Sequence, residues 1–153
     1  MLELLPVSVG VGLVVSLLFT EFFGLAAGGM VVPGYIALSL NKPGAVIATL
    51  LAGLITFWLV HGVSSVTILY GRRRTAVTIL FGYTMGYALR ILAGDALSLG
   101  PEYDVIGYII PGLIAIWILR QGIIETFASI MVVSIVCRLV ITVVLGEELI
   151  LLR

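Results

Sequence analysis

The chain has 153 residues, of which 61% are hydrophobic and only 10% are charged, and its mean hydropathy is +1.29. Soluble domains contain about 45–50% apolar and about 25% charged residues, so this sequence lacks the polar surface that a soluble globule needs. Eight basic residues balance eight acidic ones, which gives no general electrostatic case for nucleic-acid binding. We therefore expect an all-α integral membrane protein that lies in a lipid bilayer.

Four long apolar runs follow one another along the chain. A membrane-spanning helix needs about 20 predominantly apolar residues, and residues 4–23, 45–70, 75–93 and 123–145 meet or approach this length. We expect each of them to be a transmembrane helix. The first run does not resemble a cleaved signal peptide, because Glu3 stands where a basic residue is typical.

Two shorter apolar stretches, residues 26–40 and 105–119, each contain the dipeptide Pro-Gly. A straight helix of this length covers only about 22 Å of a hydrocarbon core about 30 Å thick, so we expect re-entrant or broken helices. Proline is favoured at the first position of a helix. Pro33 and Pro111 should therefore each begin a short helix, with extended backbone before it.

The two Pro-Gly stretches are copies of one motif. GMVVPGYIAL begins at Gly29, and GYIIPGLIAI begins at Gly107, 78 residues later. We interpret residues 1–153 as a single membrane domain made of repeat 1, at about 2–74, and repeat 2, at about 75–153. Each repeat consists of a helix, a short Pro-Gly segment and a helix. Two crossings per repeat would give parallel halves and four spans, whereas three would give inverted halves and six; the sequence leaves both open.

Basic and acidic residues predict the orientation. Arg72, Arg73 and Arg74 lie between two long apolar runs, and such clusters remain on the cytoplasmic side of a membrane. The next loop, around Asp95, Glu102 and Asp104, is acidic and should lie on the opposite side.

The Pro-Gly segments are the first candidate site, because interrupted helices in equivalent positions are typical of solute-handling membrane proteins. Free backbone N–H groups at the start of a short helix favour a carboxylate or another anion. The alternative is that the glycines only permit close helix packing. The candidate residues for a substrate path are Gly29, Pro33, Gly34, Tyr35, Gly107, Pro111 and Gly112.

Charged residues in or near the apolar runs form the second set of candidates. Arg138 lies well inside the last run, where a charge requires a partner, and we expect an ion pair with Glu21 or Glu125. For His61 we expect a hydrogen bond to a neighbouring helix. Arg72, Arg73 and Arg74 either anchor the topology or contact a cytoplasmic partner or an anionic product.

The sequence contains no P-loop and no spacing typical of metal ligands, so no metal site is expected and an autonomous enzyme is not indicated. Its single cysteine, Cys137, excludes a disulfide within the chain. Nucleotide chemistry would require a separate protein.

Four stretches of the sequence together form a specific pattern: Ser16-Leu17 with Glu21, GMVVPGY at 29–35, ILYGRRR at 68–74, and GYIIPGLIA at 107–115 followed by Gln121-Gly122. In these stretches the chain resembles the PgsC/CapC family, the small membrane subunit of poly-γ-glutamate synthase in capsule biosynthesis. Arg138, Glu125 and His61 are not part of the pattern.

The resemblance implies a multi-pass protein of a prokaryotic plasma membrane that works with an ATP-dependent amide ligase and a further membrane-anchored subunit. ATP and Mg would then belong to the ligase, no cofactor would belong to this chain, and polyglutamate would be exported. A homo-oligomer is compatible with this resemblance. The alternative function is a stand-alone secondary transporter for an amino acid or another small anion. A third interpretation is a purely structural membrane anchor that recruits the ligase.

Overall fold

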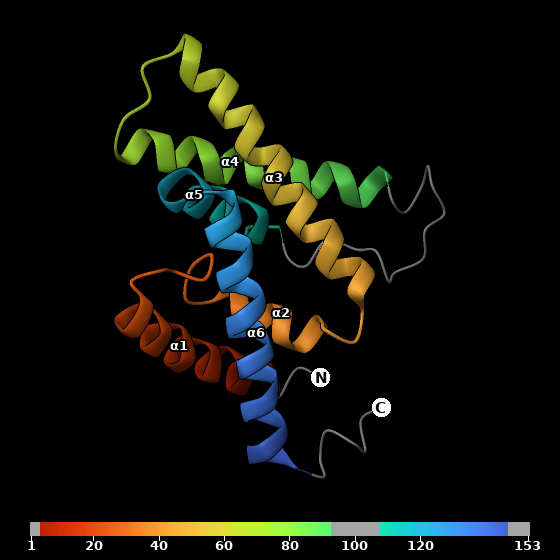
Figure 1. Cartoon of the computed structure of the whole chain (residues 1–153). Helices are drawn as coiled ribbons and strands as arrows, with labels where there is room; N and C mark the ends of the chain where they lie inside the picture. Colours follow the sequence, from red (N-terminus) through yellow and green to blue (C-terminus); the bar gives the residue numbers. More distant parts are fainter. Residues whose placement is uncertain (1–3, 93–107, 147–153) are drawn as a thin grey trace.

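The computed structural model describes residues 4–92 and 108–146 of the chain (Figure 1). Within these ranges the protein is helical and has no strand. The helices are α1 (Leu4–Phe23), α2 (Val32–Ser39), α3 (Pro43–Val66), α4 (Arg72–Ile91), α5 (Ile110–Gln121) and α6 (Ile123–Leu145). The acidic loop around Asp95, Glu102 and Asp104 lies outside the described residues.

Three helices, α1, α3 and α6, are long and apolar enough to cross a membrane. They correspond to the expected spans at 4–23, 45–70 and 123–145, and their length and composition indicate a membrane protein. The fourth expected span, 75–93, corresponds to α4, which is not among them. Arg72, Arg73, Arg74 and Arg90 lie within α4 and lower its mean hydropathy, and the count of four spans stays a prediction.

The position predicted for the three arginines is wrong by one turn. They form the first turn of α4 and do not belong to the connecting loop, which runs from Thr67 to Gly71. Gly71, with φ of +60°, precedes the helix, and arginine is a good helix former. Hydropathy alone therefore placed the start of the helix at Thr75, after the last arginine and three residues too late.

The short helices begin one residue earlier than predicted, at Val32 and at Ile110, with proline in the second position. The preceding residues, Val31 and Ile109, have φ of −90° with ψ of −34° and −25°, so the predicted extended backbone is wrong. A proline in the first turn removes an N–H group that has no partner within the helix, and the helix can include it without loss.

Helices from the two ends of the chain pack together: α1 and α2 lie against α6, whereas α4 and α5 lie against α3. In Figure 1 the short helices α2 and α5 lie in the centre, between α1 and α4, and α6 runs past both. The main core joins both short helices to α3 and α6 through Val32, Ile36, Val46, Ile110, Ile114, Ile118 and Ile130. The short helices are thus the centre of the packing.

Candidate functional site

Glycines bring the Pro-Gly segments into close contact with their long neighbours. A Cβ atom added at Gly12 of α1 would lie 2.8 Å from the Cα atom of Gly34 in α2. The hydroxyl of Ser8, one turn earlier in α1, donates to the carbonyl oxygen of Gly34 at 2.7 Å. In the same way, a Cβ atom at Gly82 of α4 would collide with Gly112 of α5. Backbones can approach this closely only where side chains are absent.

Four of the predicted path residues are enclosed by protein. Pro33, Gly34, Pro111 and Gly112 are buried, and Tyr35 packs against the main core. Such burial is typical of close helix packing, the alternative that the sequence left open, and a direct contact of these residues with a polymer stays a prediction. Gly107 lies outside the described residues.

Small residues at every fourth position of α1 and α4 are the signal that sequence reasoning missed. Ser8, Gly12 and Ser16 form this stripe in α1, and Thr78, Gly82 and Gly86 form it in α4; all six are buried. Residues four apart share one face of a helix, and stripes of small residues mark helix contacts in membranes. Each stripe faces the Pro-Gly segment that follows it.

The loop between α1 and α2 is held at the end of α5. The side chain of Gln121 accepts a hydrogen bond from the N–H of Ala26 at 3.0 Å and donates to the carbonyl oxygen of Ala26 at 2.5 Å. Gly29, with φ of +106°, lies beside the indole of Trp117. One amide side chain thereby satisfies both backbone groups of Ala26, and the first Pro-Gly segment is tied to the second half of the chain.

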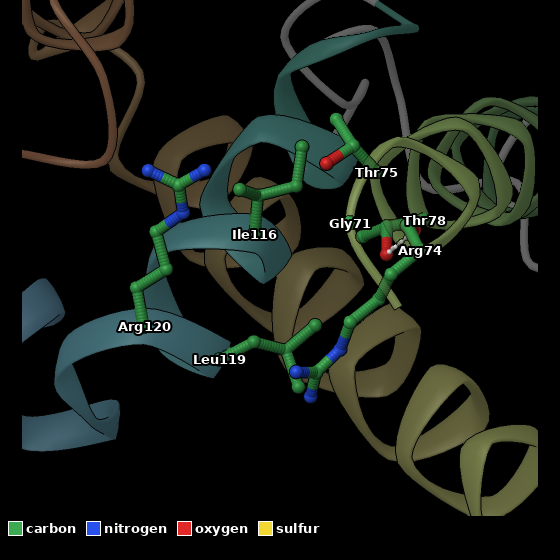
Figure 2. Close-up of a pocket in the computed structure, with 7 residues that line it drawn as sticks. All are labelled: Gly71, Arg74, Thr75, Thr78, Ile116, Leu119 and Arg120. Atoms are coloured by element: carbon green, nitrogen blue, oxygen red, sulfur yellow. Dashed lines mark hydrogen bonds between the residues drawn. The ribbon is translucent and has the colours of Figure 1, made fainter. Parts of the chain in front are cut away.

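A hollow of about 200 Å³ opens between the start of α4 and the end of α5 (Figure 2). It is lined by Gly71, Arg74, Thr75, Thr78, Ile116, Leu119 and Arg120. Of the three neighbouring arginines only Arg74 lines it, whereas Arg72 and Arg73 are exposed. Arg74 also lines a second hollow, of about 160 Å³, beside residues 64–70.

The Nε atom of Arg74 is buried and has no hydrogen-bond partner. The guanidinium of Arg120, by contrast, lies over the ring of Trp117, 5.3 Å from its centroid. In Figure 2 the side chain of Arg74 extends toward Leu119, and the guanidinium of Arg120 lies well apart from it. Arg74 therefore has one buried N–H group, at Nε, without an acceptor in the described part of the protein.

Arg138 does not form the expected ion pair. Its guanidinium donates to the carbonyl oxygen of Ala37 at 3.0 Å and to Oδ1 of Asn41 at 2.9 Å. Both acceptors lie at or just beyond the end of α2, where a cation also complements the helix dipole. Glu125 is 13 residues earlier in the same helix, about 20 Å along its axis, and Glu21 lies exposed at the end of α1, so the expectation of a carboxylate partner is wrong.

The other polar candidates have local partners. The ring of His61 stacks on that of Phe57, one turn earlier in α3, with 5.8 Å between the ring centroids. His61 is exposed, and the predicted hydrogen bond to a neighbouring helix is wrong. Arg90, near the end of α4, donates to the hydroxyl of Tyr108 at 2.7 Å. Among the described residues no three His, Cys, Asp or Glu side chains lie together as a metal site requires; that the chain binds no metal stays a prediction.

Comparison with known proteins identifies one family and two similar proteins that carry the same family name. The family described as "Capsule biosynthesis CapC" matches residues 11–127. The chain is similar to "PGA biosynthesis protein CapC" of Bacillus subtilis (strain 168), with 39% identity over 124 residues, 80% of this chain and 83% of that protein. It is also similar to "Capsule biosynthesis protein CapC" of Bacillus anthracis, with 38% identity over 135 residues, 85% of this chain and 88% of that protein. No solved structure matches the chain.

The matched region runs from α1 into α6 and includes both Pro-Gly segments, the three arginines and Gln121. It covers more than half of the chain, and the two Bacillus proteins match over most of their own lengths. The chain therefore belongs to the CapC family of capsule-biosynthesis proteins.

Proposed function

We propose that this chain is a membrane subunit of a poly-γ-glutamate synthase, and that it supports an ATP-dependent ligase partner and the export of the polymer. The observation that carries the proposal is its similarity to two CapC proteins over most of their lengths, one of them named for PGA biosynthesis. The three apolar helices support a site of action at the plasma membrane. ATP and Mg would be bound by the ligase, and this chain would be non-catalytic.

The two halves of the chain would be repeats with exchanged third helices. In support of this, α1 with α2 and α4 with α5 form matching pairs, each closed by a glycine contact, and α3 and α6 each pack on the other half. The end of α5 lies beside the loop after α1 and beside the start of α4, while the end of α4 meets the start of α5 through Arg90 and Tyr108. This alternation of ends favours three membrane crossings per repeat, which give inverted halves, over two crossings per repeat, which give parallel halves.

The start of α4 would form the cytoplasmic entrance of the polymer path. Poly-γ-glutamate carries one negative charge per residue, and a path for it needs a positive potential that is weak enough to release each residue. Arg72, Arg73, Arg74 and Arg120 gather at this end of the molecule. The same cluster favours the cytoplasmic side under the positive-inside rule.

Deleting the chain from its native host tests the proposal. Extracellular polyglutamate should disappear and should return when the intact chain is expressed again. In a second strain Arg72, Arg73 and Arg74 are all replaced by Gln, and its topology is measured in parallel because the same change can invert the protein. Polymer output should fall while insertion is unchanged. Normal polymer in the deletion strain, together with glutamate transport by the purified chain in liposomes, would instead support a stand-alone transporter.

A further inference from the structure

We propose that the hollow between α4 and α5 binds one carboxylate group of the glutamyl polymer or its precursor, with Arg74 as the residue that holds it. This inference rests on the proposed function and makes it more specific, because it assigns polymer recognition to one arginine of the three. Nothing in the name of either relative describes such a site.

The first argument is the state of the Arg74 side chain. It is partly buried, its Nε atom has almost no exposed surface, and no described residue accepts a hydrogen bond from it. Arg90 and Arg138, in contrast, donate to Tyr108 and to Asn41. A partly buried cation without an acceptor is unfavourable. A carboxylate that enters the hollow would supply an acceptor to the outer nitrogens of this guanidinium, for which no described residue is an acceptor.

The second argument is the chemistry of the lining. Besides Arg74 and Arg120, the hollow is lined by the hydroxyl of Thr75 and by Gly71, which precedes the first turn of α4. That turn has no acidic residue and no side-chain cap, so its free N–H groups and the positive end of the helix dipole are not compensated. Thr78 donates to the carbonyl oxygen of Arg74. No carboxylate of a described residue lines the hollow, and the potential of its described lining therefore favours an anion.

The third argument is size. The hollow measures about 200 Å³, less than the roughly 300–1,000 Å³ of sites that enclose drug-sized molecules. It holds about six or seven waters at about 30 Å³ each, which suits a single glutamyl unit. Among the described residues, Arg74 is the one that lines both this hollow and its neighbour of about 160 Å³. One arginine can thus contact a carboxylate on either side as a polymer passes.

The test measures the affinity of the full chain, in nanodiscs of zwitterionic lipid, for a γ-linked glutamate trimer. The variants are Arg74→Gln and its matched control Arg73→Gln, which removes the same charge from an exposed neighbour. We expect Arg74→Gln to weaken binding about tenfold or more, because hydrogen bonds between charged groups are stronger than neutral ones, and Arg73→Gln to change it by about twofold or less. A trimer with amidated carboxyl groups should not bind.

Two further variants keep the test decisive if Arg74→Gln fails to insert. Arg74→Lys retains the charge but loses the planar fork of donors and should bind with intermediate affinity. Leu119→Phe fills the hollow without a change of charge and should also weaken binding. Equal weakening by Arg73→Gln and Arg74→Gln would overturn the site in favour of a diffuse positive surface.

Inorganic phosphate and nanodiscs with anionic phospholipid separate the carboxylate from a lipid headgroup. If phosphate or anionic lipid binds the site with higher affinity than the trimer does, and displaces the trimer at a concentration below the Kd of the trimer, the assignment to a carboxylate is wrong. The yield of polymer in cells is measured for the same variants. Loss of polymer on deletion of the chain, with no effect of Arg74→Gln on trimer binding, would refute the site and leave the proposed function intact. Normal polymer on deletion, with trimer binding weakened by Arg74→Gln, would refute the proposed function and leave an anion site at Arg74.

Discussion

Replacement of Gly12 by alanine tests the contact between α1 and the first Pro-Gly segment. The added Cβ atom would lie 2.8 Å from Cα and 2.9 Å from the backbone nitrogen of Gly34. Carbon atoms make their best contact at about 3.5–4.0 Å, so the two backbones would have to separate by roughly 0.7 Å or more. Neither atom can rotate away, because both belong to the main chain.

Gly10→Ala is the matched control in the same helix, since a Cβ atom at Gly10 meets nothing within 4 Å. Both substitutions exchange glycine for alanine inside a helix and share the propensity gain of about 1 kcal/mol. Overpacking of a close contact costs about 1–3 kcal/mol. The Gly12→Ala protein should therefore be about 1–3 kcal/mol less stable than the Gly10→Ala protein.

The assay is equilibrium unfolding in mixed micelles with a rising fraction of denaturing detergent, followed by tryptophan fluorescence. Gly82→Ala extends the test to α4, where the added Cβ atom would collide with Gly112, whereas at Gly86 the nearest atom is at 3.4 Å. Gly82→Ala should thus be more destabilising than Gly86→Ala. Equal stability of the Gly10→Ala and Gly12→Ala proteins, within about 0.5 kcal/mol, would refute the packing of α1 on α2.

Two further predictions concern polar contacts that join distant parts of the chain. Gln121→Leu leaves both backbone groups of Ala26 unpaired, which costs about 1–3 kcal/mol for each group; unfolding should show a loss of about 2 kcal/mol or more, and an unchanged midpoint would contradict the contact. A double-mutant cycle between Arg138 and Asn41 should give a coupling of at least about 0.5 kcal/mol, whereas a cycle between Arg138 and Glu125 should give none. A larger coupling to Glu125 would restore the ion pair that the structure replaces.

The length of the apolar runs predicted the long helices well, because a membrane-spanning helix must be both apolar and about 20 residues long. The bounds of α1 and α6 agree with the expected runs at 4–23 and 123–145. The end of α3 does not, since the helix stops at Val66 and not at residue 70. Ser64, Ser65 and Thr67 compete with the backbone for hydrogen bonds or are β-branched, which hydropathy does not measure.

The candidate site was predicted only in part. The motif around Pro33 and Pro111 marks the two short helices correctly, but their glycines serve contacts whose partners, Gly12 and Gly82, lie in other helices. Arg74 could not be told apart from Arg72 and Arg73 by sequence, because the difference depends on which side of α4 faces α5. Gln121 meets Ala26 across 95 residues of chain, a distance that no local pattern reveals.

Copurification from the native membrane tests the central claim most directly. The tagged full chain is solubilised in mild detergent and captured, and the eluate is assayed for polymer that depends on both ATP and glutamate. We predict that an ATP-binding ligase coelutes with the chain and that the eluate makes polyglutamate. A chain that elutes alone and inactive, from membranes in which polymer synthesis is intact, would contradict the proposed role as a synthase subunit.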